Sequence, residues 1–198
     1  PVDAGSATAV FRQPILYLLG SATFLYTACE FGVWNWLAQL LISRKVDPST
    51  AQNIVGSGFA FGILVGRVVV SRVLIKIPAS MVLLASAALM LVTTYVLLQT
   101  SDPSMAWGTV FAAGIAMAPV FPTTLGMVGD AFPRGTATAM GFVITFGWVG
   151  LAVSSRVIGA LGGNDPSQLS SALMVLPAAS ALMVVIMIVL RSISPKKA

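Results

Sequence analysis

The residue with the clearest chemical potential is Glu30, the only glutamate in the chain. It lies inside an apolar run, residues 15–42, that carries no other charge and is long enough to cross a bilayer. A carboxyl group at membrane depth costs roughly 2.5–3.5 kcal/mol on insertion scales, so such residues usually face a bundle interior or a watery cavity. Glu30 is therefore the first candidate functional residue.

Polar and aromatic side chains recur at helical spacing around Glu30. The residues predicted to share its helix face are Thr23, Tyr26, Thr27 and Trp34, with Asn35 adding polarity further along. An aromatic ring beside hydrogen-bonding groups suits a sugar, whose C–H faces stack while its hydroxyls pair. Two roles stay open for Glu30: it binds solute hydroxyls, or it cycles a coupling proton. The structural alternative is a neutral acid bonded to a neighbouring helix.

The composition indicates an integral membrane protein. The 198 residues are 57% hydrophobic and only 9% charged, whereas a soluble domain is about a quarter charged. The net charge of +5 comes from basic residues scattered near segment ends, without a run of Lys and Arg interleaved with aromatics. We therefore expect the lipid bilayer, and no nucleic acid, as a partner.

Enzymatic chemistry has little support in this sequence. There is one cysteine and no histidine, so we expect no metal site and no cofactor. A membrane-embedded hydrolase needs a nucleophile with a base, paired acids or a metal, and Glu30 is the one deeply buried acid. The nucleotide-binding pattern Gly-x-x-x-x-Gly-Lys-Ser/Thr is also missing, which disfavours ATP-driven transport.

The hydrophobic pattern predicts an all-α, polytopic protein with six membrane spans. We place them near residues 15–42, 52–74, 79–99, 105–128, 136–159 and 169–190, with turn-forming residues between them. They form one transmembrane bundle, residues 15–190. Residues 1–14 are expected to be a cytoplasmic linker, and residues 191–198 a basic cytoplasmic tail.

The basic residues predict the orientation of the bundle. An even number of spans puts both termini on one side, and eight of the eleven Lys and Arg residues fall on that side. By the positive-inside rule both termini are cytoplasmic, and we expect the plasma membrane, in particular a bacterial inner membrane. The pair Arg44-Lys45, on the opposite side, is discordant with this orientation.

The glycines separate the spans into two kinds. Spans two, four and five, counted with the glycines directly next to their ends, hold 13 of the 18 glycines, and spans three and six hold none. Because glycine lets helix backbones approach closely in lipid, spans one, two, four and five should form an inner bundle, with spans three and six as lipid-facing flanks. The expected packing residues are Gly58, Gly62, Gly66, Gly147 and Gly150.

A weak internal repeat supports two halves of three spans. Residues 66–73 of span two and residues 150–157 of span five match at five of eight positions. These spans are equivalent in a 3+3 repeat and run in opposite directions, as an inverted repeat in the membrane plane requires.

Two further groups of residues are functional candidates. Pro119 and Pro122 interrupt span four, and broken backbone at membrane depth is tolerated where it lines a cavity or is buried in protein. The candidates there are Phe121, Pro122 and Thr123, as a ligand contact or a hinge, with a plain structural kink as the alternative. Arg67, Arg72 and Asp130 are expected at the cytoplasmic interface, where a pairing of Arg67 with Asp130 would form an inner gate.

Three short motifs stand out: Tyr26-x-x-x-Glu30 in span one, Gly58 to Arg67 in span two, and Phe121-Pro122-Thr123 in span four. They resemble the second half of a major facilitator superfamily (MFS) transporter of the fucose/glucose-galactose permease branch. The loop signature Gly-x-x-x-Asp-Arg-x-Gly-Arg-Arg is represented only by Gly62-x-x-x-Gly66-Arg67, with glycine in place of the acid. A charge-relay gate of the usual kind is therefore not expected.

The resemblance implies half of a 12-helix fold and a secondary transporter working by alternating access. Its substrate would be a sugar or a similar small polar solute, with a proton coupled through Glu30. Its partner would be a second six-helix half, either a missing N-terminal half or another copy. The alternatives are a non-transporting assembly or sensor protein derived from such a half, and a transporter of another solute class, such as organic anions or drugs.

Overall fold

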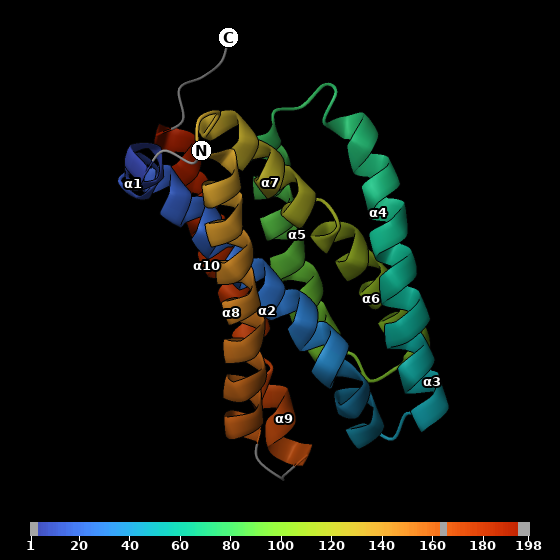
Figure 1. Ribbon diagram of the computed structural model, residues 1–198. Coiled ribbons are helices and arrows are strands. Elements are labelled where there is room, and N and C mark those ends of the chain that lie inside the picture. The colour runs from blue at the N-terminus through green and yellow to red at the C-terminus, as the bar shows by residue number, and fades with distance from the viewer. Residues whose placement is uncertain (1–3, 163–165, 194–198) are drawn as a thin grey trace.

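The computed structural model describes residues 4–162 and 166–193, and every regular element in these ranges is helical (Figure 1). In chain order the elements are α1 (Ala4–Phe11), α2 (Pro14–Ser43), α3 (Pro48–Asn53), the π-helix η1 (Ile54–Phe59), α4 (Ala60–Val73), α5 (Ala79–Gln99), α6 (Pro103–Met117), α7 (Val120–Ala131), α8 (Thr136–Gly162), α9 (Pro166–Ala172) and α10 (Val175–Ile193).

Within the described residues, six helical segments are long and apolar enough to cross a membrane. They are Pro14–Ser43, Pro48–Val73, Ala79–Gln99, Pro103–Ala131, Thr136–Gly162 and Gln168–Ile193. Each overlaps one predicted span, so the all-α, six-span fold class is confirmed. We number the spans one to six in this order.

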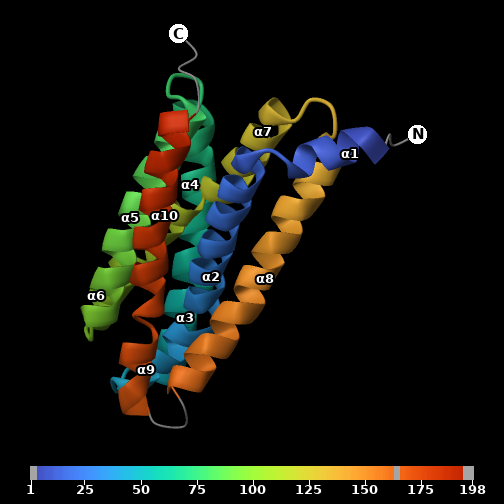
Figure 2. The same ribbon diagram turned by 90° about the vertical axis from the view of Figure 1, so that its left-hand side faces the viewer.

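The structure differs from the sequence prediction at three places. Residues 4–11, expected in a linker, form helix α1, which lies across the ends of α2 and α8 (Figure 2). Span two contains the π-helix η1, which was not predicted. Span six is interrupted between α9 and α10, whereas only the break of span four, between α6 and α7, was expected from its prolines.

Several helix starts follow from proline and aspartate. Pro14, Pro48 and Pro103 stand in the first helical turns, where a missing amide donor costs nothing. Asp47 caps α3 by accepting from the Thr50 amide at 3.0 Å. Hydrogen bonds, chiefly from the Ser49 hydroxyl, hold the pKa of the Asp47 carboxyl below its ordinary value.

The helix packing has an internal two-fold pattern. The contact of α2 with α8, between spans one and five, corresponds to that of α4 with α6, between spans two and four (Figures 1 and 2). The contact of α10 with α2, between spans six and one, corresponds to that of α5 with α6, between spans three and four. Spans three and six also pack on each other through α5 and α10, and spans one and four through α2 and α7. Exchanging span one with four, two with five and three with six maps this set of contacts onto itself. This arrangement agrees with the predicted 3+3 repeat.

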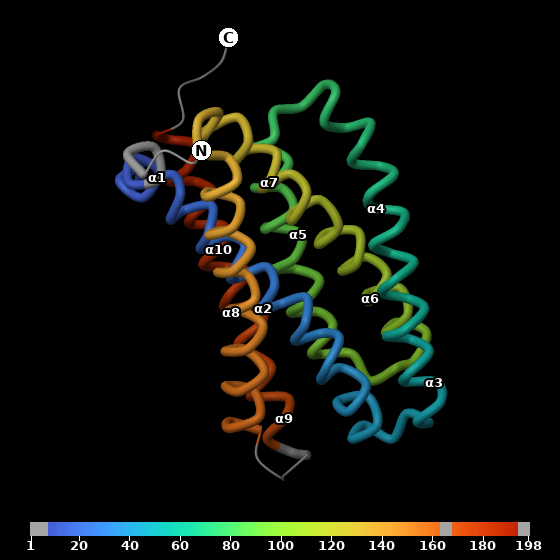
Figure 3. Tube along the Cα trace, viewed as in Figure 1, coloured from blue at the N-terminus to red at the C-terminus, as the bar shows by residue number. Residues whose placement is uncertain are grey.

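The trace in Figure 3 shows that α1 and the end of α10 lie at the same end of the bundle, which we call the terminal end. The link from α2 to α3 lies at the opposite, distal end. Spans three and six, α5 and α10, lie side by side on one flank (Figure 2). Spans two and five are the least buried of the six.

Glycines bring two helix pairs into backbone contact. A Cβ on Gly66 of α4 would lie 2.6 Å from the Cβ of Ala118, and one on Gly62 would meet the carbonyl oxygen of Phe111. On α8, a Cβ on Gly150 would meet the carbonyl oxygen of Phe24 and lie 2.8 Å from the Thr27 Oγ1. The glycines of spans two and five thus hold equivalent positions, against spans four and one respectively.

Arg44 joins three spans at the distal end. Its guanidinium donates to the carbonyl oxygens of Thr100 and Leu98, both at 2.5 Å, and to the Ser170 Oγ at 3.1 Å. It thereby satisfies carbonyls at the C-terminal end of α5, where a cation is favoured. Burial lowers the pKa of this guanidinium from its ordinary value. The discordant charge at Arg44 therefore has a structural role.

The chain turns sharply after Arg44. Lys45 adopts a left-handed conformation with φ of 67°. The Lys45 amide donates to Ile42 at 2.9 Å and the Val46 amide to Leu41 at 3.1 Å, which is a Schellman motif. This motif ends α2 and directs the chain into α3.

We predict that Gly150→Ala destabilises the bundle by roughly 1–3 kcal/mol, because its Cβ would press on the backbone of α2, which cannot move aside. Gly141→Ala, on the same helix with open space at its Cβ, is the matched control and should be neutral or stabilising by up to about 1 kcal/mol. Unfolding in detergent, followed by tryptophan fluorescence, measures both. Equal stability of the two variants would contradict the packing role of Gly150.

We also predict that Arg44→Lys lowers stability by about 2 kcal/mol, because an ammonium group cannot replace the guanidinium fork that reaches two carbonyls and a hydroxyl. Lys45→Met removes the neighbouring exposed charge and should change stability by less than about 0.5 kcal/mol. The same unfolding measurement applies. If Lys at position 44 is as stable as Arg, directed hydrogen bonding is not what Arg44 contributes.

Candidate functional site

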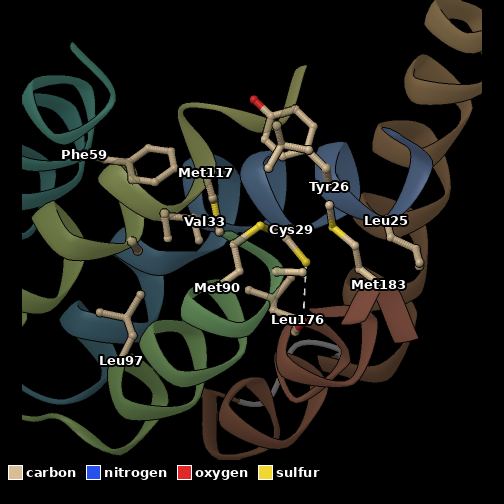
Figure 4. Packing of buried hydrophobic residues seen from close by; sticks show 14 of the residues in the cluster. Leu25, Tyr26, Cys29, Val33, Phe59, Met90, Leu97, Met117, Leu176 and Met183 are labelled. Atoms are coloured by element: carbon tan, nitrogen blue, oxygen red, sulfur yellow. Dashed lines mark hydrogen bonds between the residues drawn. The ribbon is translucent and has the colours of Figure 1, made fainter. Parts of the chain in front are cut away.

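Glu30 lies half-buried on α2, in line with Tyr26 one turn before it and Trp34 one turn after it. Tyr26 is buried, with 3% of its surface exposed, and its hydroxyl lies within hydrogen-bonding reach of the Glu30 carboxyl group. Figure 4 shows this hydroxyl turned away from the packed side chains around Cys29. The phenol thus presents a polar atom on the same side as Glu30, while its ring belongs to the core.

Arg67 of α4 acts electrostatically on this pair. Its charge reaches both Glu30 and Tyr26, and its side chain is exposed within the isolated bundle. The sequence prediction placed Arg67 at a cytoplasmic gate and did not connect it with Glu30. Residue spacing relates side chains on the same helix, and it does not show which residues of spans one and two come close together. The acid of span one therefore lies within electrostatic range of a cation of span two.

The other two gate candidates lie nearer the terminal end. Arg72 stands in the last turn of α4, and Asp130 stands in the last turn of α7, and both are exposed. A gate formed by these residues stays a prediction.

Thr27 and Asn35 face α8, which corrects the predicted single face around Glu30. The Thr27 Oγ1 donates to the carbonyl oxygen of Gly147 at 2.6 Å, and the side chain is 7% exposed. The Asn35 Nδ2 donates to the Ser155 Oγ at 3.2 Å. Because adjacent helix positions are about 100° apart, Thr27 points well away from Tyr26, whereas it lies only about 60° from Glu30 around the helix, on the side that meets α8. Its hydroxyl serves the α2–α8 contact in this conformation.

The break in span four lies in a helix that packs against α2. Pro119 precedes α7 and Pro122 stands in its first turn, so the carbonyls of Ile115 and Ala118 lose their usual amide donors. Phe121 is half-buried, and Pro122 is exposed.

Thr123 and the next residue, Thr124, are buried, and neither hydroxyl has a hydrogen-bond partner among the described residues. Together with the carbonyl groups freed by the two prolines, these two hydroxyls form a small polar region inside an apolar bundle. A buried hydroxyl without a partner is costly, so this region suits a water molecule or a polar ligand group.

An aromatic contact between spans one and two was missed by the sequence prediction. The Trp34 and Phe59 rings meet edge to face, with centroids 5.2 Å apart and planes at 75°. Phe59 is the last residue of the π-helix η1, and π-turns are frequent at functional sites. The run Gly56-Ser57-Gly58 was the one available sequence signal for irregular winding.

Other features of the structure do not belong to this site. A groove of about 530 Å³ on α4 and α6 is lined by Ser57, Ala60, Phe61, Leu64 and Trp107, none of which is a Glu30-site residue. Within the described residues, no group of three or more His, Cys, Asp or Glu side chains is placed to hold a metal ion. The arrangement around Glu30 is thus suited to binding a polar solute or moving a proton.

Comparison with known proteins gives a family match. A family model described as Major Facilitator Superfamily matches residues 19–198. No curated protein matches the chain.

We predict a stability coupling between Glu30 and Arg67 of about 0.5–3 kcal/mol. Arg67→Gln alone leaves the acid of span one without its cation and should destabilise the protein, whereas Arg67→Gln combined with Glu30→Gln should recover part of the loss. Arg72→Gln, one turn and a half further along α4, is the control and should show no coupling with Glu30→Gln. Additive effects at positions 30 and 67 would show that the two charges do not interact.

Proposed function

The chain belongs to the major facilitator superfamily of membrane transporters, and we propose that it forms one half of a secondary transporter of sugars or similar small polar solutes. The observation that carries the proposal is the half-buried carboxyl group of Glu30, which lies beside Tyr26 on α2 and within electrostatic range of Arg67 on α4. Charged groups inside a bundle are costly unless they are paired or line a polar path. A solute path between these spans accounts for all three groups.

The chemistry of the site favours a polyhydroxy solute. A carboxylate accepts hydrogen bonds from hydroxyls, a guanidinium donates to them, and the Tyr26 hydroxyl can do either. Trp34, one turn away on the same line of α2, supplies an aromatic face for the C–H side of a sugar ring. A purely apolar substrate would leave these polar groups without partners, at a cost for each.

We propose that Glu30 also couples transport to a proton. When Glu30 is ionised, the guanidinium of Arg67 would attract its carboxylate across a medium of low dielectric constant. If α4 moves away from α2 during the transport cycle, the carboxylate loses this partner and takes up a proton. Solute binding and proton binding at Glu30 would then alternate with the position of span two.

We assign the terminal end of the bundle to the cytoplasm of a bacterial cell. The helix-end residues Arg12, Arg72 and Arg191 lie at that end, and at the distal end the Arg44 guanidinium is occupied by carbonyl groups. Because Arg44 is occupied in this way, the distribution of basic residues agrees better with the positive-inside rule in the folded chain than in the sequence alone.

The partner we propose is a second six-helix half. Spans two and five are the least buried, and each exposes a row of apolar side chains: Phe61, Leu64 and Val68 on α4, and Trp148, Val149 and Val153 on α8. Trp148 contacts Phe31 of α2, the residue next to Glu30, with ring centroids 6.2 Å apart. A second half packed across the exposed rows would cover this part of the bundle.

We predict that Glu30→Gln lowers proton-dependent uptake at least about tenfold, because it removes a charged hydrogen-bonding group worth about 1.5–3 kcal/mol. The assay follows radiolabelled L-fucose, D-glucose and D-galactose in bacterial cells that lack their own hexose permeases and express this protein, with and without a protonophore. Asp102→Asn, which removes an exposed acid and leaves a residue that still caps α6, is the control.

The outcomes separate the parts of the proposal. Uptake by Glu30→Gln that keeps its full rate and protonophore sensitivity would remove the coupling role. Uptake of organic anions or drugs, with none of the three hexoses, would replace the substrate class. A protein that moves no solute in any assay and binds another membrane protein would favour an assembly or sensor role.

A further inference from the structure

Spans one and two pack closely together at one end. α3 and η1 pack against α2, whereas α4, beyond the π-turn, contacts α2 at most marginally. Figure 1 shows the same arrangement: α2 approaches span two at the distal end and diverges from it toward the terminal end. Within this half, spans one and two are therefore joined on the distal side of Glu30 and lie apart on its terminal side.

Trp34 and Phe59 join the two spans on the distal side of Glu30. Trp34 lies one turn from Glu30 on that side, and its ring meets the Phe59 ring edge to face, with centroids 5.2 Å apart. Phe59 is fully buried, and Figure 4 shows it among the packed side chains of the core. Trp34 is half-buried and packs against the same core. This pair is the side-chain contact that joins the two spans immediately distal to the acid.

Span two has a weak point at this level. Phe59 ends the π-helix η1, whose winding holds more residues per turn than an α-helix and is stable only in short pieces. One side of η1 is tight, because a Cβ on Gly58 would lie 2.9 Å from the Trp107 ring. The other side is open, because a Cβ on Gly56 would meet nothing within 4 Å. A bend of span two at η1 would thus meet resistance on one side only.

We propose that Trp34 and Phe59 form a latch that closes the Glu30 site toward the distal side, and that span two bends at η1 when the latch opens. The inference rests on the proposed transport function, in which the site must open to each side in turn. Parting of the two rings would connect Glu30 with the distal side, while spans one, three and six stay joined through Arg44.

Cysteine accessibility tests the latch without any transported solute. Ile63 is a suitable reporter position because it is half-buried on α4, one turn after Phe59 and one turn before Arg67. Ile63→Cys is made in a Cys29→Ser background, which removes the only native thiol. The protein is labelled with a membrane-impermeant quaternary-ammonium thiosulfonate in intact cells and in inverted vesicles. A separate Lys45→Cys variant shows which preparation exposes the distal end.

The expected result is slow labelling of position 63 from the distal side. In Phe59→Leu and in Trp34→Ala this labelling should rise roughly tenfold, because the loss of one aromatic pair shifts an equilibrium by about that factor. Labelling from the terminal side should stay unchanged. Phe61→Leu is the matched control, because Phe61 is an exposed ring two residues along that contacts Phe111 instead of span one. Phe59→Leu keeps most of the buried volume, and Trp34→Ala alters a partly exposed residue, so folding does not depend on one variant.

Unchanged distal labelling in both variants would overturn the latch, as would an equal rise in Phe61→Leu. Failure of the transport proposal would look different, because wild-type protein would then take up no solute while the labelling pattern stayed as measured.

Deletion of Gly56, which restores α-helical winding in η1, should lower distal labelling of position 63 in the Trp34→Ala background. Persistence of the full rise there would exclude η1 as the bending point.

Discussion

Backbone contact at glycines is the constraint on which the rest of the bundle depends. Lipid tails are as apolar as the helix surfaces, so burial of apolar area does not drive helices together in a membrane, and close packing has to do so. Gly62 and Gly66 bring α4 against α6, and Gly147 and Gly150 bring α8 against α2. The Thr27 hydroxyl, which donates to Gly147, adds a hydrogen bond to the second contact. These two contacts are related by the internal repeat, so one packing solution serves both halves of the bundle.

The glycine contacts also decide what remains free. With one side of α4 committed to α6, the side that carries Phe59, Ile63 and Arg67 at four-residue spacing is directed to span one. With one side of α2 committed to α8 through Thr27, the neighbouring stripe of Tyr26, Glu30 and Trp34 is left to meet span two. The functional constellation therefore arises from two helix pairs that are each fixed from behind. Neither Glu30 nor Arg67 needs to contribute to the stability of those pairs.

Much of this fold could be predicted from the sequence, because its main signals are local. Six apolar runs of bilayer length, the glycine positions and the isolated Glu30 each follow from composition within one segment. The break of span four could also be predicted, since proline removes a specific donor. The 3+3 arrangement rested on five matches in eight residues, and the symmetric contacts of the spans now support it.

The parts that could not be predicted depend on contacts between segments. The pattern i, i+3, i+4 groups Thr27 with Glu30, and only the position of α8 shows that the Thr27 hydroxyl donates to Gly147. The π-winding of Ile54–Phe59 has no strong sequence signature, since it depends on how Phe59 and Gly58 meet Trp34 and Trp107. Arg67 could not be connected with Glu30 because 37 positions separate them. Charge-counting treated Arg44 as a topological signal, while the folded chain uses it to bind carbonyls.

The distribution of strong and weak contacts at the distal end determines which span is free to move. Arg44 binds the end of α5 and Ser170 of α9, and so joins spans one, three and six by directed, charge-assisted hydrogen bonds. Span two is attached to span one at that end by the short link through Lys45 and by apolar contacts that include one aromatic pair. Apolar contacts can part and re-form at lower cost than desolvated charged ones, because no buried charge is left without a partner. A conformational change within this half should therefore separate span two from span one at the contact of Trp34 with Phe59, while span two keeps its glycine contacts with span four, and that movement changes the separation of Arg67 from Glu30.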